Sequence, residues 1–232
     1  MNGIGPDFYE ETKYSPGVPP DYGEMPSAPL GEIGLPKPAQ EGGTLAKLLA
    51  SRRSRRKFAG QPISIDDLSF LLWACDGVSE SGKNPAWRTA PSAGRMHPID
   101  TWVVVLRVDG LESGIYRYVP ASHSLELFRK GNYEEATVKA AAGQEWIHGA
   151  AAVFIWIAEF ARTTTRYKDR GYRYVFLDAG HICQNLYLAV ESLSLGMTAI
   201  AALVDDEVNA LVGADGEERS ILYMAALGKP VA

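Results

Sequence analysis

The sequence has only two cysteines, and neither stands at a spacing that metal sites use. Cys75 and Cys183 lie within apolar stretches, which indicates buried thiols in a reducing cytoplasm and leaves no basis for a zinc or iron–sulfur site. Long apolar runs are also missing, since none reaches the roughly 18 residues typical of a membrane span. The first residues, MNGIGPDFYEETKY, are acidic and polar, unlike a secretory signal. We therefore expect a cytoplasmic protein with no membrane segment and no metal.

Positive charge is in the minority, with 23 Lys and Arg against 28 Asp and Glu and a formal net charge of -5. Glycine-rich phosphate loops are absent too, because neither GxGxxG nor GxxxxGK followed by Ser or Thr occurs. Yet the stretch RRSRRK, residues 52–57, places five cations in six positions. So much local positive charge in an acidic chain needs a physical explanation.

Three explanations of this basic cluster fit the residues themselves. One is a solvated helix end, because cations favour helix C-termini and the preceding stretch TLAKLLAS (44–51) has a helical pattern. The second is a nucleic-acid site, although the chain is acidic and no aromatic residues interleave with the cations. The third is a small anionic ligand, since the Ser54 hydroxyl and planar guanidinium groups suit contact with a phosphate. The cluster alone does not decide among them.

Composition divides the chain into two parts. Residues 1–43 hold eight of the 14 prolines and eight glycines, a density that favours an extended arm over a regular core. Residues 44–232 carry helical and strand patterns and form the predicted domain. Within it, Ser64 and Asp67 have the spacing of a capping box, and apolar residues at i, i+3, i+4 and i+7 continue as far as Cys75.

Helices and strands are mixed along the domain. A strand is predicted at 101–108, a hairpin at 113–119 and 124–130, a helix at 133–142 and a strand at 151–159. The longest helix is predicted at 172–194, with His181 on its inner face beside Leu177. The segments MTAIAAL, DDEVNALVG (a helix capped by Asp205) and ILYMAAL finish the chain. Hairpins without strict βαβ alternation favour the α+β class.

A second informative stretch is APSAGRMHP, residues 90–98. Its small residues Ser92, Ala93 and Gly94 allow a flat ligand to approach the backbone closely. The alternative is an ordinary tight loop that leads into the strand at 101–108. Together, the basic cluster and this loop suit the opposite ends of one phosphorylated planar cofactor.

Several stretches resemble the flavin-dependent nitroreductase superfamily, namely RRSRRKF, PISIDDLSFLLWACDGV and RTAPSAGRMHPIDTWVVV. The early IGPDFYEETKY and the later YKDRGYRYVFLDAGHICQNLYLAVESLSLGM are similar to its SagB-type branch, which includes dehydrogenases that oxidise azolines to azoles in modified peptides. The resemblance covers nearly the whole chain. It implies a nitroreductase-like α+β fold with a central, mostly antiparallel sheet flanked by helices. It also implies an intertwined homodimer that binds two FMN molecules at its interface, with the arm wrapping the partner.

The resemblance assigns cofactor-binding residues. The family's Arg-x-Ser-x-Arg/Lys pattern, which binds the phosphate, ribityl chain and pyrimidine edge of FMN, corresponds to Arg52, Ser54 and Arg56, with Arg53 adjacent. Arg55 and Lys57 then face elsewhere. The loop that lines the flavin, often contributed by the other subunit, corresponds to Pro91, Ser92, Ala93 and Gly94.

Two further segments correspond to the flavin site of the family. The backbone that approaches the N5 side of the flavin matches Ala199, Ile200 and Ala201, where Ala201 replaces the usual glycine. Lys229 stands where a basic residue often reaches the phosphate.

The branch also implies candidate catalytic residues. Its azoline dehydrogenases carry a Lys-Tyr acid/base pair just before the long helix, and here Arg166 and Tyr167 take these positions. Arginine stays protonated, so Tyr167 is the candidate for proton transfer and Arg166 for an electrostatic or substrate-anion contact. The alternative is that both are exposed loop residues.

The implied function is that of an FMN-dependent oxidoreductase that passes hydride through flavin N5 to or from a small molecule or a peptide. NADH or NADPH would be a transient donor, and no nucleic acid would bind. One alternative is an azoline-to-azole dehydrogenase of a peptide-modifying complex. The other is a non-catalytic protein that binds or stores FMN.

Overall fold

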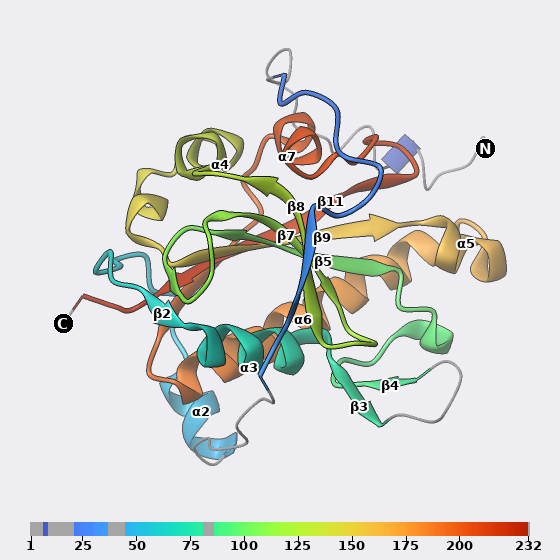
Figure 1. Ribbon diagram of the computed structural model, residues 1–232. Helices are drawn as coiled ribbons and strands as arrows, with labels where there is room; N and C mark the ends of the chain where they lie inside the picture. Colours follow the sequence, from blue (N-terminus) through green and yellow to red (C-terminus); the bar gives the residue numbers. More distant parts are fainter. Residues whose placement is uncertain (1–6, 9–20, 37–44, 81–85, 232) are drawn as a thin grey trace.

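The computed structural model describes residues 7–8, 21–36, 45–80 and 86–231. Its centre is a seven-stranded sheet in which every neighbouring pair of strands is antiparallel (Figure 1). The strand order is β1 (Gly31–Gly34), β8 (Ser124–Lys130), β7 (Gly114–Val119), β5 (Ile99–Val105), β9 (Ala152–Glu159), β11 (Arg219–Gly228), β10 (Gly196–Ile200). The predicted α+β class with a central antiparallel sheet is confirmed.

Strand β9, which lies between β5 and β11, explains why the sheet is covered on both sides. Successive side chains of a strand point to opposite faces, and β9 is apolar at nearly every position. Phe154, Trp156 and Ala158 belong to one buried apolar cluster, and Val153, Ile155 and Ile157 belong to another. A strand with two apolar faces is stable only between two layers of cover.

Helices supply both layers, as Figure 1 shows. One face is covered by α3 (Ile65–Asp76) and the long helix α6 (Arg170–Ser192), whose buried residues join the first cluster. The other is covered by α4 (Glu134–Ala140) and α7 (Asp205–Val212), whose buried residues join the second. None of the described helices is both long and apolar enough to cross a membrane.

Short elements connect these layers. They are α2 (Leu45–Ser51), α5 (Ala161–Tyr167), the 3-10 helices η1 (Ala93–Arg95) and η2 (Glu145–Gly149), the parallel pair β2 (Ile63–Ser64) and β6 (Val108–Asp109), and the antiparallel pair β3 (Val78–Glu80) and β4 (Trp87–Arg88).

The two cap predictions have different outcomes. The capping box is confirmed, because the Asp67 N–H donates to Ser64 Oγ at 3.0 Å and the Ser64 N–H donates to Asp67 Oδ2 at 3.2 Å. The predicted cap of α7 is wrong. Asp205 is the first residue inside the helix, and Val204 takes the cap position without a side-chain hydrogen bond.

The described part of the N-terminal arm packs on its own chain. Residues 31–34 form the edge strand β1, which pairs with β8. Earlier in the arm, the Arg129 guanidinium donates to the carbonyl oxygens of Tyr22 and Gly23 and lies over the Tyr22 ring. Residues 21–36 therefore contact their own chain, and the expectation that the arm wraps a partner stays a prediction. Residues 1–6, 9–20 and 37–44 lie outside the described residues, so the arm's division from the domain stays a prediction.

The segment after α2 is held against the end of the sheet by Phe58. This side chain is buried, and its residue forms an isolated bridge with Pro230 beyond β11. The Ala59 N–H donates to the Lys229 carbonyl at 2.8 Å, and the Gly60 N–H donates to the Gly149 carbonyl at 3.2 Å. Gly149 makes this close approach possible, because a Cβ there would stand 2.6 Å from the Phe58 carbonyl oxygen. The basic cluster is therefore fixed at its C-terminal end.

We expect Gly149→Ala to lower the free energy of unfolding by about 1–3 kcal/mol, because the new methyl group must displace backbone rather than a flexible side chain. Gly34→Ala is the matched control, since a Cβ at Gly34 meets nothing within 4 Å. Its effect should stay within about 0.5 kcal/mol. Urea unfolding of both variants measures the difference, and equal stabilities would contradict the tight contact.

Candidate functional site

The basic cluster lies along β10, the edge strand of the sheet. The Arg55 N–H donates to the Met197 carbonyl at 2.8 Å, and Thr198 Oγ1 donates to the Arg55 carbonyl at 2.8 Å. Ser54 forms an isolated parallel bridge with Met197. The cluster therefore runs as an extended segment beside the strand that contains Ala199 and Ile200, rather than as a free helix end.

Tyr187 on α6 joins the parts of this region. Its hydroxyl lies 2.9 Å from Ser54 Oγ and accepts the Ala199 N–H at 2.9 Å. The Arg52 guanidinium carbon lies 5.1 Å from the centre of its ring. Tyr187 thus brings together three residues that the sequence predicted as one site. Sequence reasoning missed it, because nothing in its local pattern distinguishes it from a core tyrosine.

The cations of the cluster are not equivalent. Arg55 pairs with Glu191 at 2.6 Å, and this hydrogen bond lowers the pKa of the Glu191 carboxyl below its ordinary value. Arg53 donates to the carbonyl oxygens of Ala50 and Arg52 at the end of α2. The Arg55 guanidinium is therefore paired with a carboxylate, and the Arg53 guanidinium is bonded to backbone carbonyl oxygens.

Of the four cations that the resemblance assigns to FMN, Arg53 bonds to backbone carbonyl oxygens and three are left for a ligand. Within the described part of the chain, no carboxylate pairs with Arg52, Arg56 or Lys229. The backbone at Lys229 lies beside the end of the basic cluster, since the Val231 N–H donates to the Lys57 carbonyl at 3.0 Å. Guanidinium, ammonium and hydroxyl groups are donors that suit a phosphate. The donor set of this region therefore fits the phosphate end of FMN.

The small-residue loop forms the second predicted part of the site. Gly94 has φ +61°, a left-handed conformation that favours glycine. A Cβ there would stand 2.5 Å from the Tyr167 hydroxyl and 3.1 Å from Arg166 Nη1. The structure therefore places the predicted catalytic pair against the predicted flavin loop.

The alternative that Arg166 and Tyr167 lie in a loop is wrong. They form the last turn of α5, a helix that the sequence analysis missed. The Arg166 guanidinium lies over the Tyr167 ring at 5.2 Å, and Tyr167 packs edge-on against Tyr174 with ring centroids 5.1 Å apart. These aromatic contacts fix the position of the Tyr167 hydroxyl beside Gly94.

Asp178 on α6 holds the loop from below. It is buried, and its Oδ1 accepts the Ala93 N–H at 3.4 Å, while Ser92 Oγ accepts the His97 N–H at 2.9 Å. Burial raises the pKa of Asp178, and burial lowers the pKa of His97 to about 4. His97 is therefore neutral at neutral pH.

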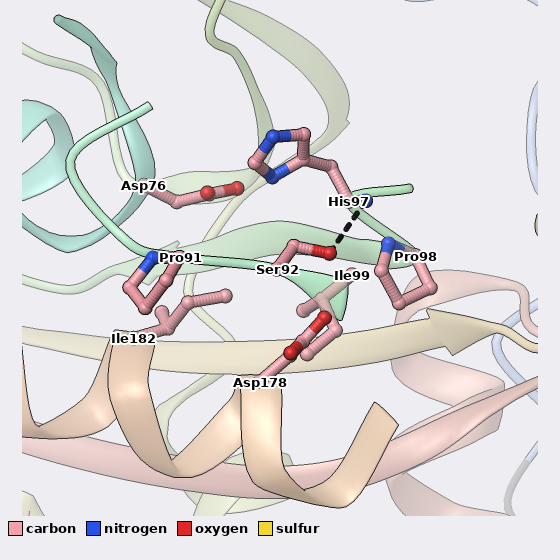
Figure 2. Close-up of a pocket in the computed structure, with 8 residues that line it drawn as sticks. All are labelled: Asp76, Pro91, Ser92, His97, Pro98, Ile99, Asp178 and Ile182. Carbon is pink, nitrogen blue, oxygen red and sulfur yellow. Dashed lines mark hydrogen bonds between the residues drawn. The ribbon is translucent and has the colours of Figure 1, made fainter. Parts of the chain in front are cut away.

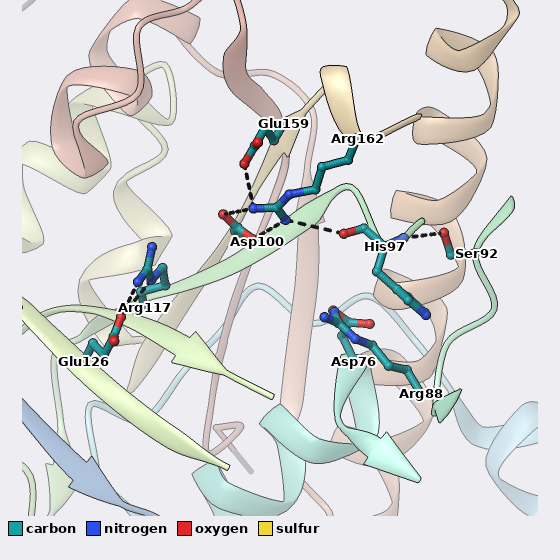
Figure 3. A network of polar contacts seen from close by, with 9 residues as sticks. All are labelled: Asp76, Arg88, Ser92, His97, Asp100, Arg117, Glu126, Glu159 and Arg162. Carbon is teal, nitrogen blue, oxygen red and sulfur yellow. Dashed lines mark hydrogen bonds and ion pairs between the residues drawn. The ribbon is translucent and has the colours of Figure 1, made fainter. Parts of the chain in front are cut away.

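Arg162 anchors the end of this loop (Figure 3). It pairs with Asp100 at 2.7 Å and with Glu159 at 2.6 Å, and it donates to the His97 carbonyl at 3.4 Å. Sequence reasoning missed both Arg162 and Asp178, because their role depends on contacts between segments far apart in the chain.

Asp76 lies close to the same loop and pairs with Arg88 at 2.5 Å (Figure 3). Burial raises the pKa of Asp76 to about 7, although Arg88 opposes the shift. Asp100 and Asp178 add to it, because a second negative charge nearby disfavours ionisation.

The structure does not bring the two parts of the site together within one chain. Ser54 contacts α6 at Tyr187, whereas the loop contacts α6 at Asp178. Nine residues separate these contacts, which amounts to roughly 14 Å along the helix axis and half a turn of rotation about it. The basic cluster and the loop therefore lie on opposite sides of α6.

An exposed face of α6 lies between these two sides. Its residues are Arg173, Leu177, Gly180, His181 and Gln184. The prediction that His181 and Leu177 lie on the inner face is wrong. The inner face is formed by Val175, Ala179, Ile182 and Leu186, which pack in the first apolar cluster.

Comparison with protein families identifies one match. The model of the Nitroreductase family matches residues 49–229. A nitroreductase-type protein of Methanocaldococcus jannaschii is 36% identical over 168 residues, which is 72% of this chain and 83% of that protein. The trifolitoxin operon protein TfxC of Rhizobium leguminosarum bv. trifolii is 27% identical over 214 residues, 84% of this chain but only 58% of TfxC.

Solved structures share the fold. A nitroreductase-type protein from Ralstonia eutropha superposes with a TM-score of 0.74 at 28% identity, over 92% of this chain and 98% of that chain. One from Anabaena variabilis gives 0.76 at 28% identity and covers 97% of this chain but 47% of that chain. The Escherichia coli microcin synthetase McbBCD complex, solved with truncated pro-MccB17 bound, gives 0.68 at 20% identity, over 98% of this chain and 87% of that chain, which shows a common fold.

We expect Asp76 to make stability depend on pH. With a pKa of about 7 in the folded state and an ordinary value of 3.8, the folded chain keeps a proton that the unfolded chain has released. Raising the pH from 4 to 7 should therefore destabilise the protein relative to Asp76→Asn, by up to about tenfold in the unfolding constant per pH unit.

Urea unfolding at a series of pH values measures this difference. Asp66→Asn, an exposed change on the same helix, is the control and should show a nearly constant difference from the wild type. A difference for Asp76→Asn that does not vary between pH 4 and 7, or one that grows in the opposite direction, would show that Asp76 ionises normally.

Proposed function

The chain belongs to the nitroreductase family, and we propose that it is an FMN-dependent oxidoreductase of the SagB-type branch, with NADH or NADPH as a transient donor. The observation that carries the proposal is the set of unpaired cations on the edge strand. Arg52 and Arg56 have no carboxylate partner among the described residues, and Ser54 is held beside them by Tyr187. Guanidinium groups without a carboxylate partner beside a fixed hydroxyl suit an anion such as phosphate.

The residues of this region would divide the binding of FMN. Arg52, Ser54, Arg56 and Lys229 would bind the phosphate and ribityl chain. The backbone of Ala199, Ile200 and Ala201 would lie along the flavin ring, and Pro91–Gly94 would cover it. When bound, FMN supplies hydride transfer, and the protein contributes binding, orientation and the local charge.

Tyr167 and Arg166 would act on the substrate. The Tyr167 hydroxyl is fixed beside Gly94, where it can hold or move a proton at the reacting molecule. Arg166 stays protonated and would attract an anionic group of the substrate instead of accepting a proton.

A second copy of the chain would complete the site. The basic cluster and the Pro91–Gly94 loop touch opposite sides of α6, so one planar molecule does not reach both parts along one face of the helix. The exposed face between them includes Leu177, which is 55% exposed. These observations support a homodimer in which the loop of one subunit covers the flavin bound by the other.

Peptide oxidation is the second candidate function. It is favoured by the similarity to TfxC of the trifolitoxin operon and by the fold shared with the McbBCD complex. The substrate would then be an azoline-containing peptide, in a peptide-modifying complex. Arg166 stands where the azoline dehydrogenases have lysine, so Tyr167 would be the only acid/base residue of the pair. The two buried free thiols support a cytoplasmic location for either function.

We expect the purified protein to show flavin absorbance bands that bleach when NADPH or NADH is added anaerobically. Bands that persist would favour peptide oxidation or FMN storage over a reductase. A colourless protein that cannot be loaded with FMN would overturn the proposal.

In the same preparation, Arg52→Ala and Arg56→Ala should each raise the Kd for FMN by about tenfold or more, because each loses a charged hydrogen bond to the phosphate. Lys57→Ala is the control and should change the Kd by less than about threefold, since it removes an equal charge at a position predicted to face elsewhere. Flavin fluorescence titration measures all three values, and equal losses would mean that only net charge matters.

We expect Leu177→Asp to dissociate the dimer, because a carboxylate would be desolvated in the subunit contact. Leu177→Met keeps the apolar character and should remain dimeric. Sedimentation velocity gives the oligomeric state of both, and FMN titration should show weaker binding to the monomer. A monomeric variant with unchanged FMN affinity would show that one chain forms the whole site.

A further inference from the structure

A small cavity lies beneath the Pro91–Gly94 loop, between the end of α3, the start of β5 and the inner side of α6 (Figure 2). Its polar lining comes from three separate parts of the chain: Asp76 on α3, Ser92 and His97 in the loop, and Asp178 on α6. Pro98, Ile99 and Ile182 close the rest of the wall. Polar side chains from distant segments thus converge on one space that the proposed function does not use.

Three polar atoms in this lining lack a hydrogen-bond partner among the described residues. They are Oδ1 of Asp76, Oδ2 of Asp178 and Nε2 of His97, and all three are buried. Asp76 is 2% exposed and Asp178 is 4% exposed. Buried polar groups in folded proteins are paired with few exceptions, and a polar cavity usually supplies the missing partner as ordered water.

Hydrogen bonds made by other atoms of the same residues hold these residues in place. The other carboxylate oxygen of Asp178 accepts the Ala93 N–H, and the Ser92 hydroxyl accepts the His97 N–H. The other oxygen of Asp76 accepts from Arg88. The unpartnered oxygens of Asp76 and Asp178 therefore belong to carboxylates whose other oxygen is already held, and His97 is held through its backbone N–H.

We propose that this cavity binds ordered water that bridges Asp76, Asp178 and His97, and that Asp178 is thereby a positioning residue for the Pro91–Gly94 loop. The water would fix the orientation of the Asp178 carboxylate, and the carboxylate would fix the Ala93 N–H. The role of this loop in covering FMN rests on the proposed function, whereas the bound water and the contact between Asp178 and the loop do not.

The protonation of the surrounding groups suits such a network. A neutral His97 offers one donor and one acceptor, and a carboxyl group with a raised pKa keeps a proton that it can donate to water. The charged groups around the cavity are Arg88 and Arg95 near His97, Asp100 near Asp76, and His181 near Asp178. The negative charge of Asp178 also helps to raise the pKa of Asp76, because a second negative charge nearby disfavours ionisation.

A crystal structure of the full chain at high resolution, with and without FMN, tests the water directly. We expect density within hydrogen-bond distance of Asp76 Oδ1, Asp178 Oδ2 and His97 Nε2 in both forms. A dry cavity, or one closed by direct contact between these side chains, would overturn the proposal. Flavin atoms that take the place of the water in the FMN form would overturn it as well.

Two substitutions of nearly equal size test the positioning role. Asp178→Leu removes the hydrogen-bonding groups, and Asp178→Asn keeps an acceptor for Ala93 and a partner for water. We expect Asp178→Leu to speed hydrogen exchange at the Ala93 and His97 amides about tenfold or more, and Asp178→Asn to change it less than about threefold. If the leucine variant does not fold, Asp178→Ala replaces it, because it removes the carboxylate without adding apolar bulk.

The Leu186 amide on the same helix is the internal control, and its exchange should match the wild type in every variant. Exchange at Ala93 and His97 that stays within twofold of the wild type in a folded Asp178→Leu or Asp178→Ala protein would overturn the positioning role. An asparagine variant as fast as the leucine variant would overturn it as well. Because exchange is measured without FMN, the test of the positioning role remains valid even if the protein does not bind FMN.

Discussion

The packing of α6 against the sheet is the constraint on which the rest of the structure depends. Its inner face places Ile182 and Leu186 in the core, and this burial fixes the helix in position and in rotation. Tyr187 and Asp178 are then fixed on two sides of the same rigid rod, and each holds one part of the candidate site. The distance and the angle between the basic cluster and the loop are therefore properties of a core helix, not of the loops themselves.

Two cations of the basic cluster contact this helix, and only one of them is neutralised there. Glu191, near its C-terminal end, pairs with Arg55 and lowers the local charge of the cluster by one. Arg52 keeps its charge and lies over the Tyr187 ring, a contact that holds a guanidinium without neutralising it. An acidic protein can thus keep a compact cationic site, because the partners that would cancel it are aromatic or absent among the described residues.

The sequence predicted what depends on local pattern. The apolar run of β9, the hairpin of β7 and β8, and the Ser64–Asp67 capping box all follow from neighbouring residues, and the structure contains them. The short helix α5 escaped prediction because ARTTTRY has no apolar periodicity. The inner face of α6 was misassigned because Leu177 and Leu186 are equally apolar, and only the position of the sheet selects one of them.

The candidate site also has parts that the sequence predicted and parts that it did not. The resemblance predicted the individual residues, and the structure places them in two groups that no pattern in the sequence separates. Tyr187, Asp178 and Arg162 were missed because each acts on a segment far away in the chain. The substrate is harder to predict from the sequence for a chemical reason. In flavoenzymes the cofactor carries the redox step, so few side chains need to act on the substrate. In the proposed site, Arg166 beside Tyr167 would be the side-chain feature that bears on the substrate, because a permanent cation attracts negative charge and does not accept a proton.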